Sequence, residues 1–277
     1  MKCAWKELLA VLPQNIRQDV DNLGRESLQE IRLRQGQPVQ LICHKQMHWL
    51  NTTVTATDLN FTVNAASRYS PWAVTSISYG YLTAQGGHRI GIAGEAVVRE
   101  GQTTGIKNIT SLCVRVARDF PGLAAELRQI RDSLLILGPP GSGKTTFLRD
   151  LIRQIADKSC VAVVDERGEL FPPGGGFEQG KQVDVLSLCS KPIGIDMALR
   201  TLGPSYIAMD EITSESDCAA LIRAGWCGVR LLATAHASDI NDLFSRSVYR
   251  PLVNTGLFQT AVVLKPDKSW KLERMKL

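Results

Sequence analysis

One segment of the chain has the residue types and spacing of a phosphate-binding loop. Residues 138–145, Gly-Pro-Pro-Gly-Ser-Gly-Lys-Thr, fit the pattern G-x-x-x-x-G-K-[ST]. Its glycines let backbone N–H groups turn toward phosphate oxygens, and the amino end of the following helix adds partial positive charge. The side-chain ammonium of Lys144 can reach the β- and γ-phosphates, and the Thr145 hydroxyl can ligate Mg²⁺. We expect ATP and Mg²⁺ to bind here, at Gly138, Pro139, Pro140, Gly141, Ser142, Gly143, Lys144, Thr145 and Thr146.

A pair of acids follows a second apolar segment. Residues 206–209, Tyr-Ile-Ala-Met, lead directly into Asp210 and Glu211. In proteins with such a phosphate loop, an acid at this strand end holds Mg²⁺, and an adjacent carboxylate orients or activates the attacking water. We therefore expect Asp210 to share the metal with Thr145, and Glu211 to act as the catalytic carboxylate. Taken alone, the same segment would indicate only a strand that ends in a solvated acidic turn.

Polar residues also follow two other apolar segments. Asp165, Glu166 and Glu169 come after Val163-Val164, and His236 comes two residues after Thr234. The carboxyl ends of parallel strands meet at one edge of a sheet, where ligands bind. Asp165, Glu169 and His236 therefore join Lys144 and Glu211 as expected catalytic residues, with Thr234 and His236 placed to sense the γ-phosphate. The alternatives are solvated loop acids at 166 and 169, and a structural hydrogen bond at His236.

The elements that must position these residues alternate between short apolar strands and helices. The pattern predicts strands over 134–137, 161–164, 206–209 and 229–234, with helices over 144–156, 195–202, 214–225 and 239–246, and a closing hairpin over 258–275. Strands that read as continuous apolar runs are typical of a parallel sheet covered by helices on both faces. We expect an α/β fold with a RecA-like core and a mostly parallel sheet.

The first part of the chain has a different character. Strands are predicted over 30–33, 39–44, 81–83, 89–98 and 111–118, with helices over 4–12, 14–23 and 57–69. Turn residues at Asp119-Phe120-Pro121-Gly122 and a short predicted helix over 123–131 precede the apolar strand of the second part. We expect a smaller α+β domain over 1–125, followed by a nucleotide-binding domain over 126–277.

Composition excludes several classes of protein. Of the 277 residues, 44% are hydrophobic and 21% charged, as in folded globular proteins, and no apolar run is long enough to cross a bilayer. The seven cysteines have neither CxxC nor zinc-ligand spacing, which favours reduced thiols in a cytoplasmic protein. The net charge is +5, and residues 1–130 hold 14 Lys and Arg against 10 Asp and Glu. This modest excess, with 6% aromatic residues, gives no sign of a nucleic-acid platform.

The four motifs, in this order, resemble those of the secretion ATPases, which include type II and type IV secretion motors and pilus retraction motors. The corresponding segments are 138–145, 165–169, 206–211 and 231–236, and 30–38 resembles the opening strand and turn of the N-terminal domain of those motors. One departure is that the motors usually carry Gly-Glu where this chain has Asp210-Glu211.

A narrower resemblance, to the stage III sporulation protein AA family, covers most of the chain. The resemblance rests on segments 81–83, 87–91, 105–107, 138–150, 164–169, 184–186, 210–212, 233–236 and 256–258. The resemblance implies an ATPase of the mother cell in endospore-forming bacteria. It also implies membrane-protein partners in a channel between mother cell and forespore, with the ATPase held at the membrane through those partners.

The resemblance further implies a hexameric ring with nucleotide between subunits. An arginine from a neighbouring subunit would suit such a site, because its positive charge stabilises the transition state of phosphoryl transfer. The candidates are Arg89, Arg115 and Arg118 in the first domain, and Arg200 and Arg223 in the second.

Three functions therefore remain open from the sequence. The first is an ATP-hydrolysing ring motor that acts on a membrane-linked apparatus, with no nucleic acid expected as a partner. The second is a nucleic-acid-dependent ATPase, because RecA-like cores also drive helicases. The third is a nucleotide-gated scaffold with slow hydrolysis, although such a switch would not need the second carboxylate, Glu211.

Overall fold

The computed structural model describes residues 1–43, 46–67, 77–78, 80–172 and 176–275. The chain divides into two compact units: the first holds Met1–Asp119 and Pro172–Phe177, and the second holds Phe120–Phe171 and Glu178–Leu277. The expected domain boundary, after residue 125, falls a few residues inside the second unit. The sequence did not predict that Pro172–Phe177 belongs to the first unit.

The first unit is built on an antiparallel sheet with the strand order β3-β2-β1-β6-β5-β4. Its strands are β1 (Leu28–Arg34), β2 (Pro38–Cys43), β3 (Met47–Thr53), β4 (Tyr81–Thr83), β5 (Arg89–Arg99) and β6 (Gln102–Arg115). Its helices are α1 (Trp5–Val11), α2 (Gln14–Leu23) and α3 (Ala56–Ser67), with a short 3₁₀ turn, η1 (Gln85–Gly87). Apolar residues of all three helices share one buried core with the sheet, as in an α+β domain.

The second unit contains a seven-stranded sheet with the order β13-β12-β7-β11-β10-β8-β9. Its strands are β7 (Leu134–Leu137), β8 (Val161–Asp165), β9 (Val183–Ser187), β10 (Tyr206–Met209), β11 (Arg230–Ala235), β12 (Thr260–Leu264) and β13 (Trp270–Arg274). All neighbouring pairs are parallel except β12 and β13, which form the closing hairpin. The mostly parallel sheet predicted from continuous apolar runs is confirmed.

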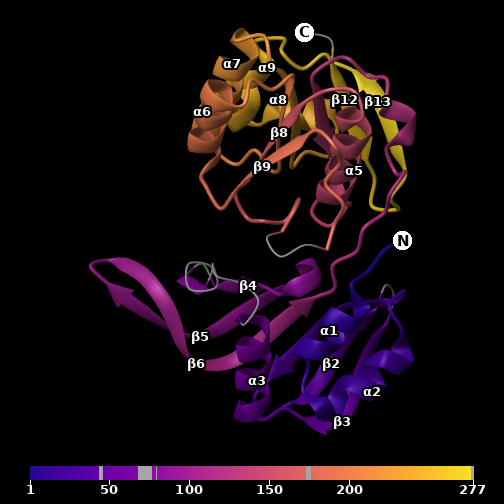
Figure 1. Ribbon diagram of the computed structural model, residues 1–277, viewed down its shortest axis with the longest axis vertical. Coiled ribbons are helices and arrows are strands. Elements are labelled where there is room, and N and C mark those ends of the chain that lie inside the picture. Colours follow the sequence, from indigo (N-terminus) through magenta and orange to yellow (C-terminus); the bar gives the residue numbers. More distant parts are fainter. Residues whose placement is uncertain (44–45, 68–76, 79, 173–175, 276–277) are drawn as a thin grey trace. The chain divides into compact units, whose positions relative to one another are not determined.

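Helices cover both faces of this sheet (Figure 1). They are α5 (Lys144–Ala156), α6 (Lys191–Thr201), α7 (Glu215–Trp226), α8 (Ile240–Ser245) and α9 (Arg250–Val253), with 3₁₀ turns η2 (Ala125–Leu127) and η3 (Ser247–Tyr249). Apolar residues of α6 to α9 pack with alternate residues of the strands, such as Leu135, Leu137 and Val164, in one core. α5 packs through Phe147 against Trp270 of β13, with ring centroids 5.4 Å apart.

Several elements differ from the expectations. The structure adds β3 and β9, the helix predicted over 123–131 is only the turn η2, and β6 begins at Gln102 rather than 111. The predicted strand over 39–44 and helix over 57–69 each extend onto residues that lie outside the described ones, namely 44 and 68–69. No helix in the described ranges combines the length and apolar character that a membrane span requires.

Candidate nucleotide-binding site

The loop between β7 and α5 has the backbone geometry of an anion cradle. Gly141 and Gly143 have φ values of 72° and 100°, a left-handed conformation that other residues adopt only with strain. Gly143 is the N-cap residue of α5, and it supplies no side chain to cap the first N–H groups of that helix. These N–H groups and the helix dipole are the usual partners of a phosphate at a helix amino end.

A buried hydroxyl in the same loop supports this interpretation. Ser142 is 2% exposed, and among the described residues its Oγ has no hydrogen-bond partner. A buried polar atom without a partner costs free energy, and such atoms are often satisfied by a ligand or water. The loop is therefore preformed for an acceptor-rich group, and a nucleotide phosphate fits these donors.

Lys144, the first residue of α5, folds back over the loop. Its Nζ donates to the carbonyl oxygens of Gly138 and Pro139 at 2.9 and 3.0 Å, and it lies 3.0 Å from Nδ1 of His236. Burial lowers the pKa of Lys144 from its ordinary value, while the charges of Asp210 and Glu211 act in the opposite direction. The ammonium group is thus held at the mouth of the loop by partners that a phosphate can replace.

Asp210 follows β10 and meets the loop through a hydroxyl. Thr145 Oγ1 donates to Asp210 Oδ2 at 2.6 Å, and Thr234 Oγ1, from β11, donates to Asp210 Oδ1 at 2.7 Å. A hydroxyl and a carboxylate are ligands that Mg²⁺ accepts together with phosphate oxygens and water. The two predicted metal ligands, Thr145 and Asp210, therefore lie together. Among the described residues no group of three or more His, Cys, Asp or Glu is placed to hold a metal ion.

Glu211 occupies a strained backbone position. Its φ is 51°, in the left-handed region, and its N–H donates to Thr234 Oγ1 at 2.8 Å. Its carboxylate lies between two side chains: Arg167 Nη1 donates to Oε2 at 2.8 Å, and His236 Nε2 lies 3.2 Å from Oε1. Because the Lys144 ammonium has only hydrogens to offer, His236 Nδ1 accepts from it and Nε2 carries the proton toward Glu211. Strain of this kind concentrates at functional sites.

The carboxylate of Asp165, at the end of β8, is hydrogen-bonded to the loop that follows it. Its carboxylate accepts the backbone N–H groups of Glu169, Leu170 and Phe171 at 2.8 to 3.0 Å, and the residue is 2% exposed. Burial raises the pKa of Asp165 to about 6, although the N–H groups of Phe171 and Leu170 lower it. The structure thus places Asp165 as the anchor of the loop that presents Glu169.

Glu169 lines the main cavity of the site. This cavity has a volume of about 230 Å³ and includes residues of the phosphate loop with Glu169, Asp210, Glu211, Thr234 and His236. Five of the strand-end residues singled out from the sequence are therefore brought together at one edge of the sheet. Glu166 instead pairs with the buried Lys191 at 2.6 Å, beside the cavity.

Arg167 and Lys191 were not assigned roles from the sequence. Arg167 lies within the acidic segment 165–169. Its position directly after a predicted strand could have identified it as a residue of the site. Lys191 begins α6, and its Nζ lies 3.8 Å from Asp217 as well as contacting Glu166. No sequence pattern marks Lys191, because the packing of α6 against both β8 and α7 brings these three charges together.

Four of the five candidate arginines, all but Arg223, have partners within their own units. In the first unit, the Arg89 guanidinium lies 4.2 Å from the Tyr81 ring centroid, Arg115 Nε lies 3.5 Å from Glu30, and Arg118 donates to the carbonyls of Arg25 and Leu28. In the second unit, Arg200 pairs with Asp196 at 3.0 Å. Arg118 is the most deeply engaged of the four, since three donor contacts hold its guanidinium.

Comparison with solved structures finds the same fold in a pilus retraction motor and in a bacterial ATPase. The pilus retraction motor PilT with bound ADP is matched over 95% of this chain and 83% of its own, with a TM-score of 0.63 and 16% identity. The ATPase DotB of Legionella pneumophila is matched over 90% of this chain and 76% of its own, with a TM-score of 0.54 and 18% identity. The fold class is thus α/β with a mostly parallel sheet, preceded by a smaller N-terminal domain, and it is shared with these two proteins.

Sequence comparison is more specific. The chain belongs to the family described as Sporulation stage III, protein AA, which matches residues 4–272. A curated relative, Stage III sporulation protein AA of Bacillus subtilis strain 168, is 34% identical over 95% of this chain and 91% of its own length. A protein of Cyanidium caldarium, ycf45, is 29% identical over 60% of this chain and 54% of its own. The predicted family resemblance is confirmed.

Proposed function

We propose that this protein binds ATP with Mg²⁺ and hydrolyses it, as a subunit of a ring-shaped motor. The observation that carries the proposal is the convergence of Lys144, Thr145, Asp210 and Glu211 at one sheet edge, with Thr145 Oγ1 and Asp210 Oδ2 2.6 Å apart. Gly138, Pro139, Pro140, Gly141, Ser142, Gly143 and Thr146 complete the expected phosphate cradle. Further support comes from the family match and from the fold shared with secretion ATPases.

In this mechanism each residue has a distinct task. The N–H groups of the loop and the Lys144 ammonium hold the phosphates, while Thr145 and Asp210 supply ligands to the metal. Bound with the nucleotide, Mg²⁺ neutralises charge that develops on the phosphate oxygens. Glu211 orients and deprotonates the attacking water, and Arg167 and His236 fix the direction of its carboxylate.

His236 gives the site a way to respond to the phosphate. Lys144 and Glu211 contact opposite nitrogens of the same ring, at 3.0 and 3.2 Å. When a phosphate draws Lys144 away from Nδ1, the ring loses the partner that fixes its tautomer, and its bond to Glu211 changes. His236 therefore couples occupation of the loop to the water-activating carboxylate, and Asp165 and Glu169 support this arrangement from the loop after β8.

The cellular role is a proposal drawn from the family. We place the protein in the cytoplasm of the mother cell, where it energises a membrane-associated channel during endospore formation. Membrane proteins of that channel are its proposed partners, with no nucleic acid involved. Six copies form the proposed ring, in which Arg89, Arg115, Arg200 or Arg223 reaches a neighbour's phosphates. Arg118 is the weakest candidate because carbonyl groups already hold it.

Two substitutions test the enzymatic proposal. Glu211→Gln keeps the size and one acceptor oxygen of the side chain but cannot take a proton, so ATP binding should persist while phosphate release falls by about 10²-fold or more. Lys144→Ala should abolish nucleotide binding. The readouts are phosphate release with Mg²⁺ and binding of a fluorescent ATP analogue.

Matched controls change the same residue types elsewhere. Glu215→Gln alters an exposed acid in the first turn of α7, and Lys181→Ala alters an exposed lysine; both should leave binding and hydrolysis unchanged. Hydrolysis by Glu211→Gln at the rate of the unsubstituted protein would overturn the assignment of Glu211. Retained binding by Lys144→Ala would overturn the nucleotide site itself.

A further inference from the structure

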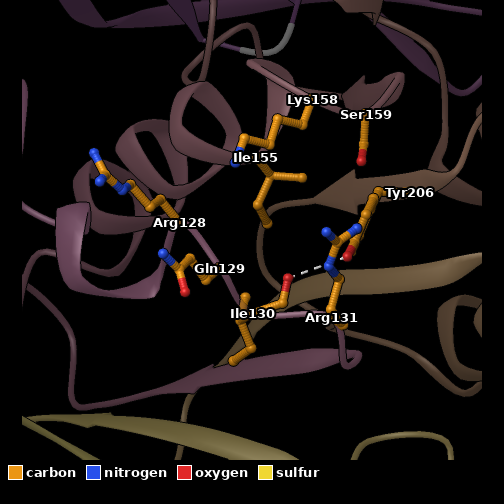
Figure 2. A pocket seen from close by; sticks show the side chains of 8 residues that line it. All are labelled: Arg128, Gln129, Ile130, Arg131, Ile155, Lys158, Ser159 and Tyr206. Carbon is orange, nitrogen blue, oxygen red and sulfur yellow. Dashed lines mark hydrogen bonds between the residues drawn. The ribbon is translucent and has the colours of Figure 1, made fainter.

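The second unit contains another pocket, at the edge of the sheet opposite the nucleotide site. It has a volume of about 360 Å³ and is lined by Arg128, Gln129, Ile130, Arg131, Ile155, Lys158, Ser159 and Tyr206 (Figure 2). Tyr206 begins β10, whereas Asp210 and Glu211 follow its other end. The pocket is therefore distinct from the site built around the phosphate loop.

Three short segments form the pocket walls. Arg128 to Arg131 connect η2 to β7, Lys158 and Ser159 follow the last residues of α5, and Tyr206 lies at the amino end of β10. The Tyr206 hydroxyl donates to the carbonyl oxygen of Ile130 at 3.3 Å and so joins the first segment to the sheet. The ring of Tyr206 is 1% exposed, which gives the pocket a fixed floor.

The charges of the pocket are all of one sign. Arg128, Arg131 and Lys158 carry positive charges, and none of the eight lining residues is acidic. In the described part of the chain, these three residues take part in no ion pair. A fourth cation, Arg230, lies over the Tyr206 ring at 5.3 Å from its centroid. Like charges that share a small space repel one another, and a bound anion relieves that repulsion.

The polar groups of the pocket are predominantly donors. The two guanidinium groups, the ammonium, the Ser159 hydroxyl and the Gln129 amide offer many N–H and O–H groups. Figure 2 shows Arg131, Ser159 and Tyr206 at one side of the pocket, and Arg128 and Gln129 at the other. Guanidinium groups match the oxygen geometry of phosphate, and two separated groups suit two phosphates in one ligand.

From this arrangement we propose that the pocket binds a small anion that carries two or more phosphate groups. Arg128 and Arg131 contact different phosphates, and Lys158 adds charge between them. The cavity exceeds what a single phosphate needs, and it lies at the lower end of the size range of small-molecule sites. This site is independent of the nucleotide site, so the proposal does not rest on ATP hydrolysis.

The test measures binding of radiolabelled pyrophosphate to the full chain by equilibrium dialysis. The Lys144→Ala substitution is introduced throughout, so that the phosphate loop does not contribute. In this background pyrophosphate should bind at one site per chain. Adding Arg128→Gln and Arg131→Gln should weaken that binding at least tenfold, because the guanidinium donors and two charges are lost.

The control removes two charges elsewhere. Arg99→Gln with Arg250→Gln changes two exposed arginines outside the pocket and should leave the affinity within twofold. Because Arg128 and Arg131 are also exposed, both double variants should fold, which circular dichroism checks. Equal weakening of pyrophosphate binding in the two double variants would overturn the proposal. Absence of pyrophosphate binding would overturn it as well, even if a single-stranded oligonucleotide binds.

Discussion

At the scale of single residues, the site is organised around carboxylates in contrasting surroundings. Asp165 is buried and accepts three backbone N–H groups, whereas Glu211 is held by the side chains of Arg167 and His236. The first arrangement fixes a loop, and the second directs an acid toward the cavity. This difference explains why two acids at similar strand ends take different roles in our proposal.

Asp165 should give the protein a characteristic dependence of stability on pH. Its pKa rises from 3.8 to about 6 on folding because burial penalises the charged form. Its contribution to the free energy of unfolding is therefore complete below about pH 4 and is lost as the pH rises through about 6. The stability difference between the unsubstituted protein and Asp165→Asn should fall by roughly 3 kcal/mol over this range and stay constant above it.

Urea unfolding at a series of pH values measures this difference. Asp184→Asn serves as the control, because Asp184 is an exposed aspartate on β9 of the same unit. The difference between Asp165→Asn and the unsubstituted protein is compared, at each pH, with the difference between Asp184→Asn and the unsubstituted protein. A difference for Asp165→Asn that grows with rising pH would contradict the assigned direction of the pKa shift.

The sequence predicted the members of the site better than their contacts. The phosphate loop, Asp210, Glu211 and His236 could be identified because each follows an apolar strand of a parallel sheet, and such ends meet at one edge. The contacts of Lys144 with His236, and of Arg167 with Glu211, could not be predicted. These contacts join residues 92 and 44 positions apart in the sequence, so they depend on how the folded elements direct the side chains.

At the scale of elements, α6 lies close to β8 because it contains a glycine. A Cβ atom at Gly194 would lie 2.5 Å from Val164 Cγ1 and 2.9 Å from Cys189 Sγ. Contacts that short force side chains and backbone to move. The helix also positions Lys191, whose ion pairs with Glu166 and Asp217 border the site.

Gly194→Ala should therefore destabilise the second unit by about 1–3 kcal/mol, despite the higher helix propensity of alanine. Thermal unfolding followed by calorimetry measures the effect. Gly105→Ala is the matched control, because no atom lies within 4 Å of the added Cβ and the φ of Gly105 is not in the left-handed region. Unchanged stability in Gly194→Ala would show that α6 can shift away from β8 without cost.

Two strands, β3 and β9, were not predicted from the sequence, and both lack a strong hydrophobic pattern. Strand β3, Met47–Thr53, alternates between exposed and partly buried residues at a sheet edge, so its sequence lacks an apolar face. β9 is likewise an edge strand with only partly buried or exposed residues. The central strands β7, β8 and β10 are buried at every position, and these were predicted to within one residue.

At the scale of the whole molecule, the proposed nucleotide ligand should stabilise the second unit selectively. The phosphate loop, Asp210 and Glu211 all belong to the second unit. A ligand that binds only the folded form raises stability by about 2.7 kcal/mol at a concentration of 100 times its Kd. Mg²⁺–ADP should therefore raise the temperature of the same calorimetric transition that Gly194→Ala lowers.

Lys144→Ala provides the control for this experiment, because its transition should not move with nucleotide. The protein concentration is kept constant, since assembly would also change the transition temperature. A transition that responds to Gly194→Ala but not to Mg²⁺–ADP would contradict the placement of the nucleotide site in the second unit.

The closing strand β13 has a consequence for how copies of the protein behave in concentrated solution. Among the described residues it pairs only with β12, so one side of its backbone is the end of the sheet. An open strand edge is a template for pairing with another chain, which leads to aggregation. Lys271, Glu273 and Arg274 place charges along this edge, and Lys271 pairs with Glu273. These charges disfavour uncontrolled edge-to-edge growth, so the chain carries its own protection against fibre formation at this end of the sheet.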